Sequence, residues 1–136
     1  MKCILLVVSL VVGSFFQVKA QQAILGKWLT PEKDGHIEIY EQGNKYFGKI
    51  VWGKDIRLDE KNPKPELRKR SLLGVTILNG FEYKNNQWIN GTIYDPNNGK
   101  TYQCKMELEK GNKVLRVRGF IGFSLLGRTE LFTKVE

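Results

Sequence analysis

The segment HIEIYEQGNKYFGKIVW, residues 36–52, decides the fold because it contains two alternating runs around one tight turn. Ile37 and Ile39 share one face of the first run, and polar residues occupy the other face. This period of two is typical of a half-buried β-strand. Gly43 and Asn44, which separate the two runs, are residue types that favour a hairpin turn. The segment therefore predicts an antiparallel hairpin.

Short alternating runs separated by turn residues continue along the rest of the chain. We find no long stretch with apolar residues at helical spacing, so we expect an all-β protein. The expected strands are Gly26–Thr30, His36–Gln42, Lys45–Trp52, Leu72–Lys84, Trp88–Asp95, Lys100–Leu108, Lys113–Phe120 and Gly127–Val135. A meander of this size removes its exposed edges when it closes on itself. The predicted fold is an eight-stranded antiparallel up-and-down β-barrel.

One predicted connection, Gly53–Ser71, is long and charged and contains the segment LDEKNPKPELRKR. Pro65 suits the first position of a short helix through Arg70, because proline there loses no intrahelical hydrogen bond. Long loops in compact domains commonly have a function. The candidates for a polar rim around a pocket entrance are Asp59, Asn62, Arg68 and Arg70. The alternative is a capped, salt-bridged loop that covers one mouth of the barrel.

The N-terminus has the features of a secretory signal peptide. The basic Lys2 precedes an apolar run from Ile4 to Phe16, and Ala20 ends a segment typical of a cleavage site. We expect residues 1–20 to be removed and residues 21–136 to form one barrel domain that is periplasmic or extracellular. The apolar run is short for a bilayer, so we expect no membrane span.

The chain of 136 residues carries a formal net charge of +8, or about +6 without Lys2 and Lys19. Basic residues are scattered among acidic ones except in the run Arg68-Lys69-Arg70. Such scattered charge favours solubility, and we expect no nucleic-acid partner.

The residue types that usually carry catalysis or bind metals are scarce. Only Cys104 remains once Cys3 leaves with the predicted signal, so no intrachain disulfide can form. His36 is the sole histidine, which excludes a multi-histidine metal site and leaves a catalytic triad without support. We therefore expect a non-enzymatic protein with no metal, no cofactor and no catalytic residues.

The segment YDPNNGKTY, residues 94–102, resembles the start of a calcium loop, but the twelfth position from Asp95 holds Met106 where such a loop needs glutamate. We interpret it as a hairpin in which Gly99 adopts the left-handed conformation. The alternation after this turn places Tyr102 and Cys104 on the inner face. Cys104 is then a packing residue rather than a reactive thiol.

Residues Gly26-Lys27-Trp28 resemble the G-x-W signature of lipocalin-like (calycin) barrels. In that family the tryptophan closes one barrel end and an arginine near the last strand stacks on it, a place that Arg128 would take. Four blocks are distributed along nearly the whole chain after residue 25: GKWLTPEKDGHIEIYEQGNKYFGKIVW, LDEKNPKPELRKRSLLG, GTIYDPNNGKTY and LRVRGFIGFSLLGRTELFTKV. They resemble a bacterial secreted family, domain of unknown function 2147. The resemblance implies export, a calycin-type barrel and no established activity. Phe132 departs from the tryptophan usual in that family.

Arg116 and Arg118 lie on one face of a predicted strand and offer the clearest candidate for ligand chemistry. If they point inward, they could bind a carboxylate or phosphate. If they point outward, they would pair across strands with Glu107, Glu109 or Glu130. We favour the outward arrangement because two buried arginines without assured partners are costly.

From these observations we expect a non-enzymatic protein of the bacterial envelope whose barrel binds a small hydrophobic or anionic ligand. The candidate ligand-binding residues are Trp28, Trp52, Tyr94, Tyr102, Arg116, Arg118 and Arg128. The alternative is a filled barrel that acts as a protein-interaction or envelope-stress accessory through its surface and long loop. Ligand identity and oligomeric state stay open at this point.

Overall fold

The computed structural model describes residues 19–121 and 123–136, and side chains 121 and 123–126 are left out of this description. Nearly all of the predicted signal, residues 1–18, lies outside the described residues. Within the described part of the chain, no helix has the length and apolar character that crossing a bilayer requires.

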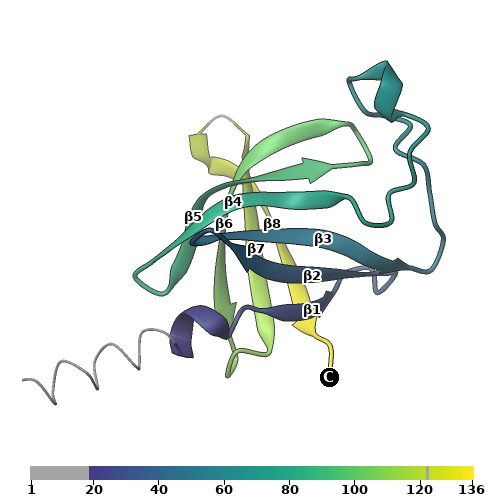
Figure 1. Ribbon diagram of the computed structural model, residues 1–136. Coiled ribbons are helices and arrows are strands. Elements are labelled where there is room, and N and C mark those ends of the chain that lie inside the picture. The colour runs from purple at the N-terminus through teal and green to yellow at the C-terminus, as the bar shows by residue number, and fades with distance from the viewer. Residues whose placement is uncertain (1–18, 122) are drawn as a thin grey trace, which may run out of the picture.

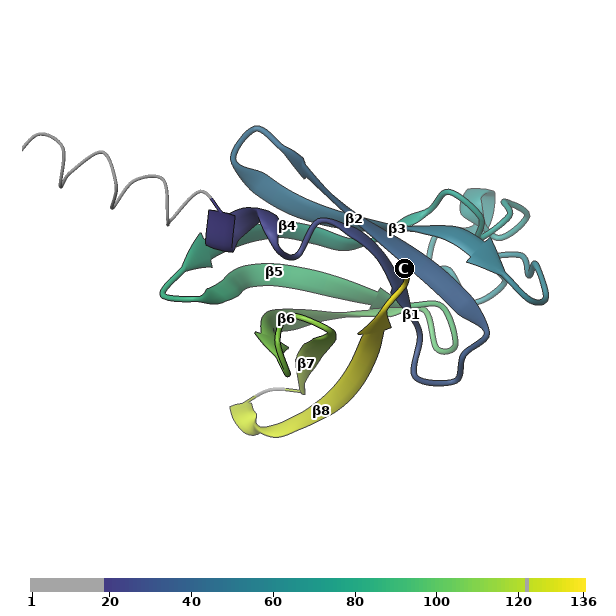
Figure 2. The same ribbon diagram turned by 90° about the horizontal axis from the view of Figure 1, so that it is seen from below.

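Eight strands follow one another around a closed antiparallel barrel, and each pairs with its neighbours in sequence order (Figure 1). The strands are β1 (Gly26–Leu29), β2 (Gly35–Gln42), β3 (Lys45–Gly53), β4 (Thr76–Lys84), β5 (Gln87–Asp95), β6 (Lys100–Glu109), β7 (Val114–Ile121) and β8 (Phe123–Lys134). The barrel closes where β1 pairs with β8, through Trp28 opposite Lys134 and Leu29 opposite Thr133. Figure 2 shows the ends of these two strands side by side near the C-terminus. The predicted fold class is confirmed.

The long connection runs from the end of β3 to the start of β4 and projects beyond the barrel (Figure 1). Its helix, η1 (Pro65–Leu67), is a single 3₁₀ turn and is shorter than the predicted helix through Arg70. After η1 the chain turns back, because Arg70 and Ser71 pair antiparallel with Asp59 and Leu58. This pairing also keeps Leu72 out of β4, which begins at Thr76 rather than at the predicted Leu72.

Large buried side chains fill one half of the barrel. The largest are Trp28, Trp88, Tyr46 and Phe81, each with an exposed fraction of 2% or less. Their volume requires small residues on facing strands: a Cβ at Gly91 would lie 2.4 Å from the Phe81 ring. Close packing of this kind closes one end, and it leaves the other half of the barrel for a cavity.

Candidate functional site

A cavity of about 590 Å³ opens at the end of the barrel opposite the tryptophan-filled half. Its floor is apolar and includes Ile37, Ile50, Ile77, Val117 and Phe132. Its mouth is formed by the β1–β2 turn, the β5–β6 turn and both ends of the long connection. An apolar interior with polar groups at the rim is the usual arrangement of a small-molecule site.

Four of the predicted ligand-binding residues line this cavity: Trp52, Tyr94, Tyr102 and Arg128. The Trp52 ring lies at the mouth, 4.7 Å from the ring of His36, measured between centroids. The hydroxyl of Tyr102 accepts a hydrogen bond from the side chain of Asn98 at 2.8 Å and so keeps its own proton available. His36 also reaches the rim, next to a register shift between His36 and Ile37.

Trp28 does not line the cavity. Its indole nitrogen donates a hydrogen bond of 2.9 Å to the carbonyl of Ile24, and its side chain is fully buried at the closed end. The prediction that it closes one barrel end is therefore confirmed by its position. The cation above its ring is Lys134, at 4.8 Å, rather than the expected Arg128. The β1–β8 register explains this correction, since it places Lys134 directly opposite Trp28.

Arg128 instead belongs to the inner face of β8. It pairs with Gly119, which lines the cavity, and forms an ion pair with Glu130 at the mouth. The hydrogen bond and charge of Glu130 raise the pKa of Arg128 above its usual value. Arg128 is the only one of the three candidate arginines that reaches the cavity.

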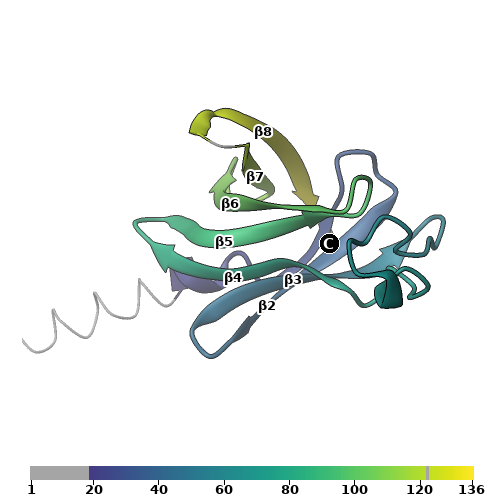
Figure 3. The same cartoon turned by 90° about the horizontal axis from the view of Figure 1, so that it is seen from above.

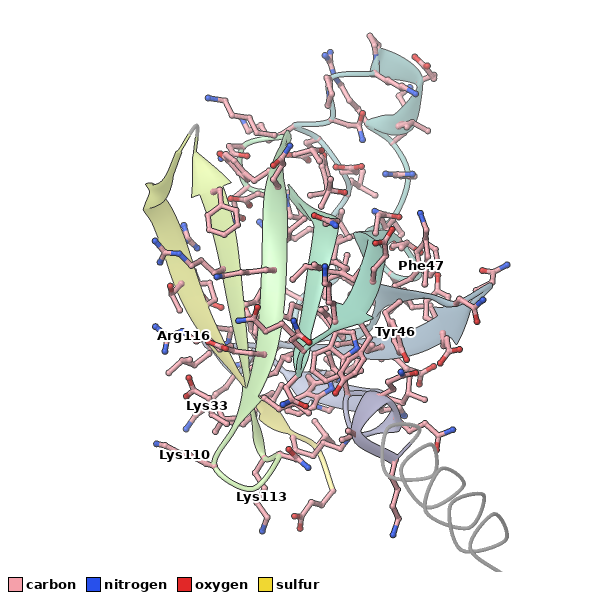
Figure 4. The ribbon with its side chains drawn as sticks, turned by 90° about the vertical axis from the view of Figure 1, so that its left-hand side faces the viewer. Lys33, Tyr46, Phe47, Lys110, Lys113 and Arg116 are labelled. Carbon is pink, nitrogen blue, oxygen red and sulfur yellow. The ribbon has the colours of Figure 1, made fainter. Side chains whose placement is uncertain are left out.

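Arg116 and Arg118 point away from the cavity, so the inward anion clamp is wrong. Arg116 donates to Glu109 at 3.0 Å and lies 3.9 Å from Glu107 (Figure 4). Arg118 donates to the hydroxyl of Thr129 at 2.8 Å. The reason is the strand alternation, because the buried Leu115 and Val117 occupy the inner face of β7. The outward arrangement with cross-strand acids is confirmed for Arg116.

The Asp59 carboxylate is fully buried beneath the long connection, although the sequence suggested an open rim. It accepts hydrogen bonds from Tyr94 at 2.5 Å, Asn62 at 2.8 Å and Arg70 at 2.9 Å. Burial raises the pKa of Asp59, but these three donors and the Arg70 charge outweigh burial and hold it below its ordinary value. Burial and the Asp59 charge raise the pKa of Tyr94 to about 12. The carboxylate therefore stays ionised and its partner tyrosine stays neutral.

Arg68 adds to this network, because it donates a hydrogen bond of 2.8 Å to the carbonyl of Asn62. Together these contacts connect the two arms of the loop. The four predicted rim residues thus hold the loop in shape, and the alternative of a capped, salt-bridged loop describes them better. The loop also contacts the β5–β6 turn. Arg57 donates to Asn97 at 3.1 Å, and Gly99 lies so close to Lys61 that an added Cβ would be 1.9 Å from its carbonyl oxygen. Figure 3 shows the loop beside this turn.

Cys104 is buried, and burial raises the pKa of its thiol to about 12. Among the described residues, no three histidine, cysteine, aspartate or glutamate side chains converge as metal ligands do. What the structure does bring together is an apolar cavity, a mixed-charge mouth and a loop fixed at its edge.

A model of the family "Uncharacterized protein conserved in bacteria (DUF2147)" matches residues 26–134. A search of curated proteins gave no match. Among solved structures, the fold is similar to that of "Protein HP1028 from the human pathogen Helicobacter pylori", which is described as belonging to the lipocalin family. The TM-score is 0.75, with 22% sequence identity over 83% of each chain. At this identity the likeness concerns the fold.

Proposed function

This chain belongs to the DUF2147 family of proteins conserved in bacteria, and from that premise we propose that it binds a small, largely apolar molecule inside its barrel. The observation that carries the proposal is the cavity of about 590 Å³. Its volume falls within the range of about 300–1,000 Å³ usual for ligand pockets. An eight-stranded barrel is wide enough for one small ligand, as in lipocalins.

The lining supports a ligand with an apolar body and a polar end. Ile37, Ile77 and Phe132 offer an apolar surface in the floor, where burying each ligand methylene contributes about 0.8 kcal/mol. Polar groups lie at the mouth, where Tyr102 has a hydroxyl proton to donate and Arg128 is paired with Glu130. An acidic head group would have to compete with Glu130 for Arg128. In this proposal, the apolar body of the ligand therefore contributes most of the binding.

We also propose, as expected from the sequence, that the protein is exported and is not an enzyme. The basic residue and apolar run at the N-terminus support export. The buried Cys104 and the tilted ring contact between His36 and Trp52 support a binding role rather than an enzymatic one. The alternative of a filled barrel describes only the closed half of the molecule.

A cavity-filling substitution tests the proposal. A Cβ at Gly119 would make ordinary contacts of 3.6 Å with Ile93 and 3.8 Å with Tyr102, so Gly119→Leu can add its side chain to the cavity without breaking a hydrogen bond. Thr133→Leu adds a leucine on the outer face of β8 and is the matched control.

Each protein is purified gently, extracted into organic solvent and examined by mass spectrometry, then heated with a panel of fatty acids. We expect a retained apolar molecule, or a raised Tm with at least one fatty acid, for the unsubstituted protein and for Thr133→Leu. Gly119→Leu should lose both signals. Repeated absence of both from the unsubstituted protein, or full binding by Gly119→Leu, would contradict binding in the cavity.

A further inference from the structure

Exposed apolar side chains concentrate at one edge of the cavity mouth. Among the described residues, the large apolar side chains that are exposed are Trp52, Ile56, Leu58, Leu73 and Leu131. Four of these five lie at the end of β3 or in the long connection, and Ile56 has the largest exposed fraction, 64%. Such a concentration on a small protein indicates a surface that contacts something apolar.

The loop register forces these side chains outward. Two short segments, 56–59 and 70–73, pair antiparallel, with Leu58 opposite Ser71; we call them the loop ribbon. Arg57 and Asp59 take one face of the ribbon and bind Asn97 and Tyr94 of the barrel.

Because side chains alternate along an extended segment, Ile56 and Leu58 must then take the opposite face. The arrangement buries an aspartate while it exposes an isoleucine and a leucine. Packing alone would favour the reverse, in which the apolar side chains are buried and the charge is solvated. The exposed apolar face of the ribbon is therefore a feature to be explained by contact with a partner.

The charge around the ribbon indicates what that partner is. Between Lys54 and Leu73 the chain has seven basic and four acidic residues, and one of the acids, Asp59, is buried against Arg70. Lys61, Lys64 and Lys69 are exposed in the same loop as the apolar residues, and the whole loop projects from the barrel (Figure 1). Exposed apolar residues flanked by basic ones complement a surface that is apolar within and anionic at its edge.

We propose that the loop ribbon and Trp52 dock onto the surface of an anionic lipid bilayer. The apolar side chains enter the interfacial region, and the lysines contact the phosphate groups of the lipids. The mouth also carries the acidic residues Glu32, Asp34 and Asp95. This inference goes beyond ligand binding, and Trp52, Ile56 and Leu73 of the proposed docking surface also line the cavity.

Vesicle co-sedimentation tests the docking. The probes are vesicles of phosphatidylglycerol and phosphatidylcholine in equal amounts, and vesicles of phosphatidylcholine alone. Leu58 and Leu131 have the same exposed fraction, 48%, so Leu58→Ser is matched by Leu131→Ser on β8. Charge reversal in the loop, Lys64→Glu with Lys69→Glu, is matched by Lys110→Glu with Lys113→Glu at the opposite end of the molecule (Figure 4). All variants share one N-terminus, which contributes equally to each.

We expect binding to the anionic vesicles that weakens with added salt, and about a tenfold loss in each loop variant but not in its control. Trp28 and Trp88 are buried, so a blue shift of tryptophan emission on binding reports on Trp52. Absence of binding to anionic vesicles overturns the proposal. This is the result expected if the partner of the ribbon is another protein. Equal losses in loop and control variants overturn it too. Gly119→Leu should bind vesicles normally, which separates this result from the fate of the ligand-binding proposal.

Discussion

The hydroxyl of Tyr94 donates a hydrogen bond of 2.5 Å to the carboxylate of Asp59, which lies 35 positions earlier in the chain. The bond joins the long connection to the end of β5 and fixes which face of the loop ribbon meets the barrel. Cavity edge, loop shape and exposed apolar surface therefore depend on one buried carboxylate.

Removal of the Tyr94 hydroxyl should destabilise the protein. Tyr94→Phe keeps the ring but leaves the buried carboxylate with one donor fewer, and we expect the free energy of unfolding to fall by about 1.5–3 kcal/mol. Tyr83→Phe is the control, since its hydroxyl bonds to Asn86 at an exposed site and its loss should cost less than about 0.5 kcal/mol. Urea unfolding measures both values. Equal midpoints for the two variants would contradict the importance of the bond.

The Asp59 network also predicts how stability depends on pH. The pKa of Asp59 is lower in the folded state than in the unfolded state, so its ionised form stabilises the fold. This contribution to the free energy of unfolding is fully present above the unfolded pKa of about 4, and it is lost as pH falls through the folded pKa. Asp59→Asn should lower the free energy of unfolding by about 2–3 kcal/mol at pH 7. This difference in unfolding free energy from the unsubstituted protein should become smaller in acid. Urea unfolding between neutral pH and pH 3 measures it. The exposed neighbour Glu60→Gln controls for charge removal, and a pH-independent difference for Asp59→Asn would contradict the network.

The barrel could be predicted from sequence because strand alternation and turn residues are local signals. The same alternation predicts that the side chains of Arg116 and Leu115 point to opposite faces of the strand. Once Leu115 is known to face inward, Arg116 must face outward. The partner of Trp28 could not be obtained in this way. It depends on the register with which β8 meets β1, and bulges elsewhere in the barrel alter that register without a clear sequence signal.

The long connection shows a different limit. Sequence identified Asp59, Asn62, Arg68 and Arg70 as one polar group but not that they bind one another around a buried carboxylate. That arrangement depends on Tyr94, which is distant in sequence and was assigned to the ligand instead. The exposed face of the ribbon was missed for the same reason, since a loop residue has no periodic pattern until its pairing is known.

Substitution at Gly99, where the loop contacts the barrel, can distinguish backbone strain from a steric clash with the loop. Gly99 and Gly43 both have positive φ, at +73° and +58°, so alanine is strained at either position. Only Gly99→Ala also meets the Lys61 carbonyl, whereas nothing lies within 4 Å at Gly43. We expect Gly99→Ala to cost about 1–3 kcal/mol more than Gly43→Ala in urea unfolding. Trypsin should also cut the basic loop faster in Gly99→Ala, and equal cleavage rates would show that the loop is not held by this contact.

The last prediction concerns the cation that covers Trp28. Lys134 donates a hydrogen bond of 2.7 Å to the carbonyl of Leu25 and lies 4.8 Å from the Trp28 ring, so it stabilises the closed end in two ways. Lys134→Met keeps the aliphatic volume but removes both interactions, and we expect a loss of about 1–2 kcal/mol in unfolding free energy. Arg128→Met removes an arginine at the open end and should cost less than half as much, because its ion pair with Glu130 is at the surface. The opposite order of the two losses would mean that Arg128, not Lys134, supports the tryptophan in solution.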